Sequence, residues 1–172
     1  MAGYTPKSLL EKLGVAGPRK LSEGKAGAGP IRRALFVAAP ACYAQTLGPL
    51  PNHVLATEAG LPPAVSISTI KKGASGPIRP SFGFIQVFCR TESELAPAIP
   101  ALKRLLASDG MLWISWPKML KSRKPTPGEL NEAKVRAFGL AGGLVDVKVC
   151  AIDETWSGLK FVFRLEDRPK RR

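Results

Sequence analysis

Apolar residues along this chain fall into short blocks that glycine, proline or charged residues interrupt. Three blocks are continuous enough for strands buried on both faces, and they cover residues 33–39 (RALFVAA), 82–89 (FGFIQVFC) and 111–116 (MLWISW). Residues 144–152 and 159–165 predict the last strands, and the linker DETWSG is long enough to let them pair antiparallel. Weaker strand signals lie in HVLATEA, from His53, and in residues 64–70 (AVSISTI), which alternate as a half-exposed edge strand does.

Helical signals separate most of these strands. We expect Thr91 to cap a helix whose apolar side recurs at helical spacing, at Leu95, Ile99, Leu102, Leu105 and Leu106. Two other helices, residues 5–13 and 126–138, are predicted because each begins with Thr-Pro, an N-cap followed by proline, and each ends before a glycine. A short helical stretch is expected at residues 42–47. Alternating strands and helices predict an α/β fold with a parallel sheet and right-handed crossovers.

The length and the loops favour one domain over residues 1–172. Residues 15–30 and 71–80 are basic and rich in glycine and proline, with little apolar surface, so we interpret them as loops. Residues 166–172 form a basic tail, for which a solvated end that aids solubility is favoured over a dedicated nucleic-acid arm.

Charge is the most unusual property of the composition. The chain has 26 Lys and Arg against 13 Asp and Glu, a formal charge of +13. Residues 1–90 contain 11 basic and 3 acidic side chains, so this half contributes +8. A basic surface raises the local concentration of phosphate-bearing partners, nucleic acids included, but selects no particular one.

Several classes of protein are excluded. No apolar run approaches the roughly 20 residues of a membrane span, and the N-terminus lacks a secretory signal pattern, so we expect a cytoplasmic protein without membrane contact. Cys42, Cys89 and Cys150 are far apart among apolar neighbours, as buried thiols are. Since His53 is the one histidine and lies outside any ligand spacing, no metal site is expected.

The second half of the chain contains longer patterns. LKRLLASDG followed by MLWISW resembles the unit that opens the fifth strand of class I methyltransferases, while LVDVKVCAID and LKFVFRLE resemble their sixth and seventh strands. The segments GYTPKSLLEKLG, LGPLP, LASDGMLWISWPK and GLVDVKVCAIDETWSGLKFV together resemble an uncharacterised bacterial family with a methyltransferase-like fold. The resemblance implies a three-layer, Rossmann-like sheet of the class I methyltransferase type, mostly parallel with the last strand antiparallel. It implies no activity.

The expected cofactor position departs from that fold's usual pattern. Such sheets bind ligands beyond the carboxyl ends of the central strands, on a glycine-rich turn. Here the turn after Val37 contains Ala39, Pro40, Ala41 and Tyr43 and no glycine. Proline removes one amide donor, and alanine Cβ atoms limit positive φ angles and close approach of a ligand.

Four other residues are candidates at the same rim. Glu58 is the one acidic residue that could hold a ribose, although a solvated loop carboxylate is the more frequent interpretation. Arg90 follows the strand 82–89, and Trp116 with Lys118 ends the next strand, where they form either an aromatic wall with a cation or a packed Trp and a solvated Lys. Adjacent Asp153 and Glu154 are interpreted as turn residues.

Three functions remain open at this point. The missing glycines and the +8 charge favour a non-catalytic binding protein for a phosphate-bearing partner, RNA among the candidates. The alternative is a methyltransferase that holds S-adenosylmethionine through an altered loop. A structural role within a larger assembly is the third, and fold alone does not choose among them.

Overall fold

The computed structural model describes residues 7–16, 30–61, 82–120 and 122–168. Within them, a six-stranded sheet has the order β2-β1-β3-β4-β6-β5. Its strands are β1 (Arg33–Val37), β2 (Leu55–Ala59), β3 (Phe82–Phe88), β4 (Leu106–Pro117), β5 (Leu144–Ala151) and β6 (Trp156–Phe163).

The direction of the strands changes once, at the last strand. β2, β1, β3 and β4 pair in parallel, whereas β6 is antiparallel to both of its neighbours, β4 and β5. The predicted mostly parallel sheet with an antiparallel last strand is therefore confirmed. Its second and third strands, β1 and β3, are nearly completely buried, as their continuous apolar sequence predicts.

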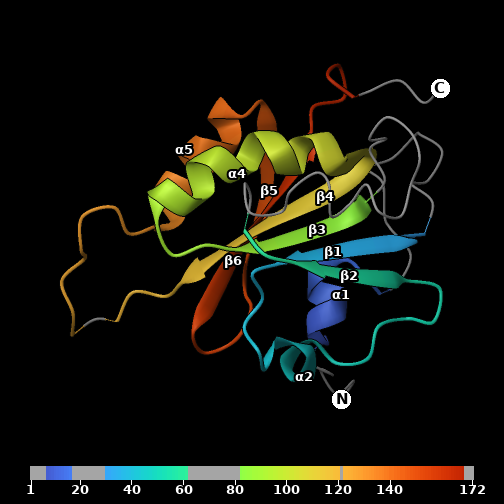
Figure 1. Ribbon diagram of the computed structural model, residues 1–172, viewed down its shortest axis with the longest axis horizontal. Coiled ribbons are helices and arrows are strands. Elements are labelled where there is room, and N and C mark those ends of the chain that lie inside the picture. The colour runs from blue at the N-terminus through green and yellow to red at the C-terminus, as the bar shows by residue number, and fades with distance from the viewer. Residues whose placement is uncertain (1–6, 17–29, 62–81, 121, 169–172) are drawn as a thin grey trace, which may run out of the picture.

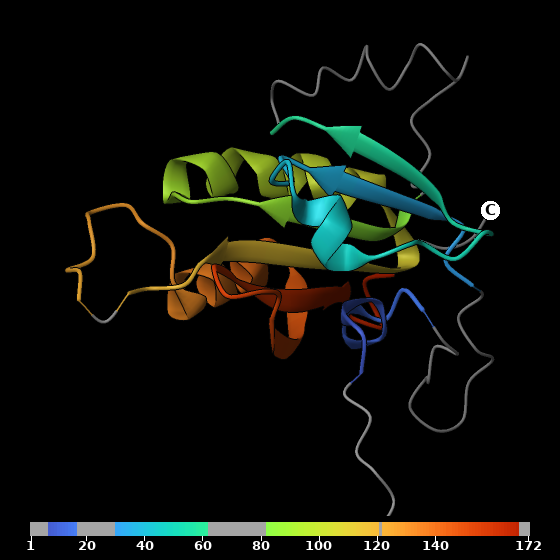
Figure 2. The same ribbon diagram turned by 90° about the horizontal axis from the view of Figure 1, so that it is seen from below.

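Helices cover both faces of the sheet and make a three-layer structure (Figure 1). α4 (Glu92–Leu105) and α5 (Glu132–Ala141) lie on one face, and the shorter α1 (Leu9–Leu13) and α2 (Tyr43–Leu47) lie on the other. Figure 2 shows the α1/α2 side, where two helices of five residues cover much less of the sheet than α4 and α5 cover opposite. The two faces have separate apolar clusters.

The helix predicted over residues 126–138 is misplaced by several residues. α5 begins at Glu132, and Asn131 is its N-cap, with Oδ1 accepting from Lys134 N at 2.9 Å. Thr126 and Glu129 instead close a turn, in which the Glu129 carboxylate accepts from Thr126 N and from the guanidinium of Arg123. Thr126 and Glu129 therefore form the hydrogen bond that the cap-like pattern predicts, but the bond closes a turn and does not begin a helix.

Two other boundaries differ from those predicted. α5 continues through Gly139, which packs against β6, so this glycine is an interior residue of the helix. β4 begins at Leu106, before the predicted start of this strand at Met111, so the Asp109-Gly110 pair lies within β4, at a shift in register with β3.

The N-terminal helix is shorter than predicted. Ser8 caps α1 in a capping box with Glu11, and Gly14 ends the helix in the left-handed conformation. The proposed cap at Thr5 lies outside the described residues, as do the edge strand 64–70, the loop 71–80 and most of the loop 15–30. No helix in the described part of the chain is long and apolar enough to cross a membrane.

The prediction of three buried thiols holds for one cysteine. Cys89 is buried, Cys150 is partly buried, and Cys42 is exposed because it lies outside the sheet, directly before α2. Among the described residues no group of His, Cys, Asp and Glu side chains is arranged to hold a metal ion.

Candidate functional site

A pocket of about 610 Å³ opens at the carboxyl ends of β1 and β2. The turn after β1, α2, the segment that follows α2, and β2 form its walls. The carboxyl ends of parallel strands, where neighbouring connections diverge, are where open α/β sheets bind ligands. The position of the pocket is therefore the one that the sequence predicts for a ligand.

The turn after β1 reaches a left-handed conformation without glycine. Ala38 has a φ of +52°, the one positive φ among non-glycine residues in the described ranges. Its N–H donates to Ala59 O at 2.8 Å, which ties the turn to the end of β2. Alanine Cβ atoms were expected to restrict positive φ, and the structure has one at the cost of local strain of about 1 kcal/mol.

Ala39, Pro40 and Tyr43 line the pocket on the α2 side, as predicted for the altered turn. Pro40 O accepts from Tyr43 N at 2.8 Å, so the turn closes directly into the first turn of α2. The lining is mainly apolar, with Phe36 and Leu50 among its members. It offers a ligand an apolar surface with few fixed polar groups, which is the usual composition of small-molecule pockets.

Glu58 contributes the one charged side chain of the lining. It is the second-last residue of β2, paired in register with Phe36 of β1, and it is exposed to solvent. No lysine, arginine or histidine belongs to this described lining. The pocket therefore suits hydroxyl or cationic groups and offers nothing that would neutralise a phosphate.

Tyr43 is buried, and its hydroxyl faces away from solvent. It donates to Gln86 Oε1 at 2.6 Å, and Gln86 Nε2 donates to Ser115 Oγ at 3.1 Å. Burial raises the pKa of Tyr43 well above its ordinary value, so the phenol stays neutral. The sequence analysis did not predict roles for Gln86 and Ser115. Each is a single polar residue within an otherwise apolar strand, and that pattern could have indicated a buried hydrogen bond.

Arg90, Trp116 and Lys118 do not line the pocket. Trp116 is buried in the apolar cluster on the α4/α5 side. Lys118 Nζ donates to Asp153 O at 2.5 Å, and the Arg90 guanidinium lies 5.2 Å from the ring centroid of Trp156. The packed-Trp interpretation of Trp116 fits this position, and the aromatic residue beside Arg90 is Trp156.

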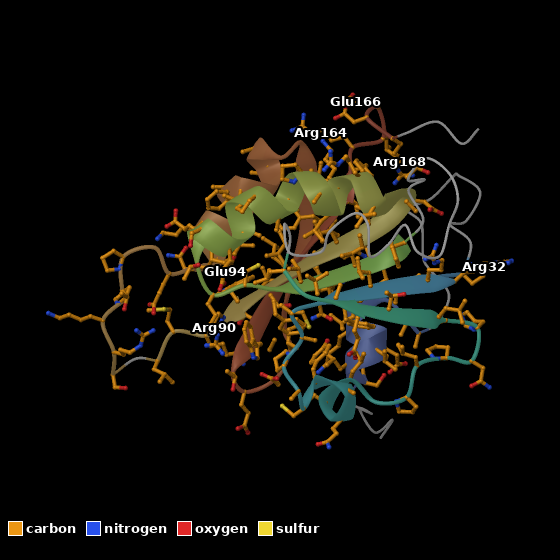
Figure 3. All side chains as sticks on the ribbon, viewed as in Figure 1. Arg32, Arg90, Glu94, Arg164, Glu166 and Arg168 are labelled. Carbon is orange, nitrogen blue, oxygen red and sulfur yellow. The ribbon has the colours of Figure 1, made fainter. Side chains whose placement is uncertain are left out.

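Both cations contact one turn of the chain. Asp153 Oδ1 accepts from Thr155 N and Trp156 N, each at 2.7 Å, so this carboxylate holds the turn between β5 and β6. Trp156 packs edge-on against Phe88, and Phe88 in turn contacts Tyr43. Figure 3 shows Arg90 and Glu94 together near the carboxyl end of β4, while Arg32 lies toward the opposite end of the sheet.

Cys89 does not supply a nucleophile at this rim. Its side chain is completely buried, and burial together with the charge of Glu94 raises the pKa of its thiol to about 12. A thiol with such a pKa is neutral near pH 7.

Comparison with known proteins defines the fold further. No family model and no curated protein matches the sequence. A crystal structure of a SAM dependent methyltransferase from Aquifex aeolicus matches 76% of this chain and 81% of its own, with a TM-score of 0.51 and 14% identity. A protein described as a possible exported protein from Bordetella parapertussis matches 76% and 61%, with a TM-score of 0.50 and 11% identity. The fold is methyltransferase-like, as predicted, and identity this low shows the fold alone.

Proposed function

We propose that the protein binds S-adenosylmethionine in the pocket beyond β1 and β2 and acts as a methyltransferase. The observation that carries this proposal is that Glu58 and the left-handed turn at Ala38 border the same pocket. Glu58 would accept hydrogen bonds from ribose hydroxyls, and the turn would bring main-chain atoms close to the ligand. The cofactor, when bound, supplies an electrophilic methyl group.

The residues present fit this group better than they fit a nucleotide. The volume of about 610 Å³ lies within the range of small-molecule sites. An apolar lining with one carboxylate suits a nucleoside that has no phosphate, whereas a di- or triphosphate would meet Glu58 and no cation. Pro40 leaves the turn one amide donor short, so Glu58 would provide a large share of the polar contacts.

Titration calorimetry with S-adenosylmethionine and S-adenosylhomocysteine tests the proposal. The wild type should bind both, and Glu58→Ala should bind at least about tenfold more weakly because a charge-assisted hydrogen bond is lost. Glu154→Ala, which removes an exposed carboxylate outside the pocket, is the matched control and should bind normally. ATP should not compete.

Two results would decide against this site. An absence of heat and of any thermal shift at millimolar ligand would remove the cofactor from consideration. Binding by Glu58→Ala that equals the wild type would place the ligand elsewhere.

We also propose a second candidate function, the binding of a phosphate-bearing partner, a nucleic acid such as RNA, at Arg90. The guanidinium is exposed, stacks on Trp156, and takes part in no ion pair among the described residues. Arginine in this state is well suited to phosphate because its charge and planar donors are available. Such a partner would lie beside the pocket, where an acceptor for methyl transfer would also lie.

Filter binding of a generic RNA at low and moderate ionic strength tests this second candidate. Arg90→Ala should weaken binding and lower its salt dependence, because one phosphate contact is lost. Arg104→Ala, which removes an exposed charge from α4, is the control. Equal losses in both variants, or no salt-dependent binding, would eliminate Arg90 as the contact.

A further inference from the structure

Two polar side chains are fully buried among the described residues, Gln86 of β3 and Ser115 of β4. Both belong to one chain of hydrogen bonds that begins at the hydroxyl of Tyr43. The chain crosses from α2 through β3 to β4 on the α1/α2 side of the sheet. It connects the pocket wall to the two central strands.

Burial of the polar Gln86 side chain among apolar residues lowers the stability of the fold unless hydrogen bonds compensate for it. Its neighbours along the same face of β3 are Phe84 and Phe88, which pack with the aromatic rings on that side. A buried carboxamide destabilises a protein unless its oxygen and its nitrogen both find partners. Here the oxygen accepts from Tyr43 and the nitrogen donates to Ser115, so both ends of the amide are bonded.

Tyr43 joins this chain of hydrogen bonds to the pocket. It is the first residue of α2 and follows the turn at Ala38–Cys42 directly. α2 has five residues, and Cys42 provides no side-chain cap, so the helix is too short to hold itself in place. The ring of Tyr43 packs against Phe88 at 4.7 Å between centroids, and its hydroxyl reaches Gln86. The Tyr43 side chain therefore anchors the turn to the sheet.

We infer that Gln86 is a positioning residue for the pocket: by holding Tyr43 it fixes the turn Ala38–Cys42 against which the ligand binds. Gln86 itself lies outside the pocket lining and acts through Tyr43. The ligand is taken to be the nucleoside cofactor of the proposed function. For the identity of the ligand, therefore, the inference rests on the proposed function.

The first experiment separates positioning from simple stability. Tyr43→Phe keeps the ring but leaves Gln86 Oε1 without its donor, so the melting temperature and the affinity for S-adenosylhomocysteine should both fall, the affinity by roughly five- to tenfold. The triple variant Tyr43→Phe, Gln86→Met, Ser115→Ala leaves no unsatisfied polar group and should recover most of the melting temperature. Its affinity should stay low because the anchor is absent.

The control is Ile99→Val, which trims the cluster on the α4/α5 side and leaves the hydrogen bonds of Tyr43 intact. It should lower the melting temperature without changing the affinity. Recovery of wild-type affinity in the triple variant would overturn the inference, because affinity would then follow stability and not the hydrogen bonds.

A second experiment needs no ligand and therefore separates failure of this inference from failure of the proposed function. Hydrogen exchange of the free protein should show the hydrogen-bonded amides of Ala38 and Tyr43, which donate to Ala59 O and Pro40 O, exchanging about tenfold faster in the triple variant than in the wild type. Ile99→Val should leave their rate unchanged relative to the rest of the sheet. Unchanged exchange of this turn in the triple variant would overturn the inference whether or not the wild type binds S-adenosylhomocysteine.

Discussion

Gly139 of α5 lies against the ring of Phe161 in β6, so closely that a Cβ atom at Gly139 would be 2.0 Å from Phe161 Cε1. Phe161 is completely buried in the apolar cluster on the α4/α5 side. The absent side chain sets how near α5 approaches the sheet, and it explains why a glycine occurs inside a helix where alanine would be the better helix former.

We predict that Gly139→Ala destabilises the protein by about 2 kcal/mol, because overpacking against a buried ring outweighs the gain in helix propensity. Gly60→Ala is the matched control, since nothing lies within 4 Å of its added Cβ, and it should be nearly neutral. Urea denaturation measures both. A neutral Gly139→Ala would mean that Phe161 is less constrained than its burial indicates.

The strained backbone at Ala38 predicts that a change to glycine there stabilises the protein, whereas Gly139→Ala destabilises it. Ala38→Gly removes the unfavourable left-handed alanine, which should raise stability by up to about 1 kcal/mol after the greater flexibility of the unfolded chain is counted. It should also tighten S-adenosylhomocysteine binding, because the lost Cβ lets the ligand approach the main chain. Ala137→Gly, in the middle of α5 and exposed, is the control and should destabilise by about 1 kcal/mol. A destabilised Ala38→Gly would show that the Cβ is needed for packing.

The central elements were predictable from the sequence for identifiable reasons. β3 and α4 match the predicted segments to within about two residues, because a continuous apolar run and a repeating apolar side each specify one structure. The antiparallel pairing of the last two strands was also predicted, because the linker DETWSG is long enough for the chain to reverse direction.

Other features depend on contacts that no local pattern contains. Thr126 lies in a sequence typical of a helix cap, yet Arg123 and Glu129 close a turn there. The N-cap of α5 is Asn131, further along the chain. The sequence around Gly139 is typical of the end of a helix. The glycine occurs inside α5 because the ring of Phe161 leaves no room for a side chain, and this contact is not visible in the local sequence.

The pocket was predictable in its position and less so in its chemistry. The turn at Ala39 and Pro40 and the carboxylate of Glu58 were predicted at this edge of the sheet, and all three line the pocket. Arg90 and Lys118 end neighbouring strands but contact the β5–β6 turn, because the direction of a long side chain depends on its tertiary neighbours.

The buried thiol of Cys89 predicts a loss of stability in alkali. Its pKa is about 12 in the folded protein and near 9 in the unfolded chain, so the folded state retains the proton over that interval. The stabilising effect is fully present below pH 9 and is lost as the pH rises toward 12. Between pH 8 and pH 10.5 the wild type should lose about 2 kcal/mol more of its unfolding free energy than Cys89→Ala loses.

Urea denaturation at the two pH values measures this difference. Burial also raises the pKa of Tyr43, but that contribution is common to both proteins and cancels. Cys42→Ala, at an exposed site, should follow the wild type. Equal losses in the wild type and Cys89→Ala would contradict the prediction.

Asp153 has a structural role that its neighbour Glu154 does not share. Its Oδ1 accepts two main-chain N–H groups of the β5–β6 turn, whereas Glu154 is exposed. We predict that Asp153→Ala destabilises the protein by about 1–2 kcal/mol and Glu154→Ala by less than about 0.5 kcal/mol. Thermal and urea denaturation of both variants check the prediction. Lys118 and Arg90 both contact this turn, so Asp153→Ala should also weaken any RNA binding that depends on Arg90. If the variant is destabilised but its RNA affinity is unchanged, the turn does not position Arg90.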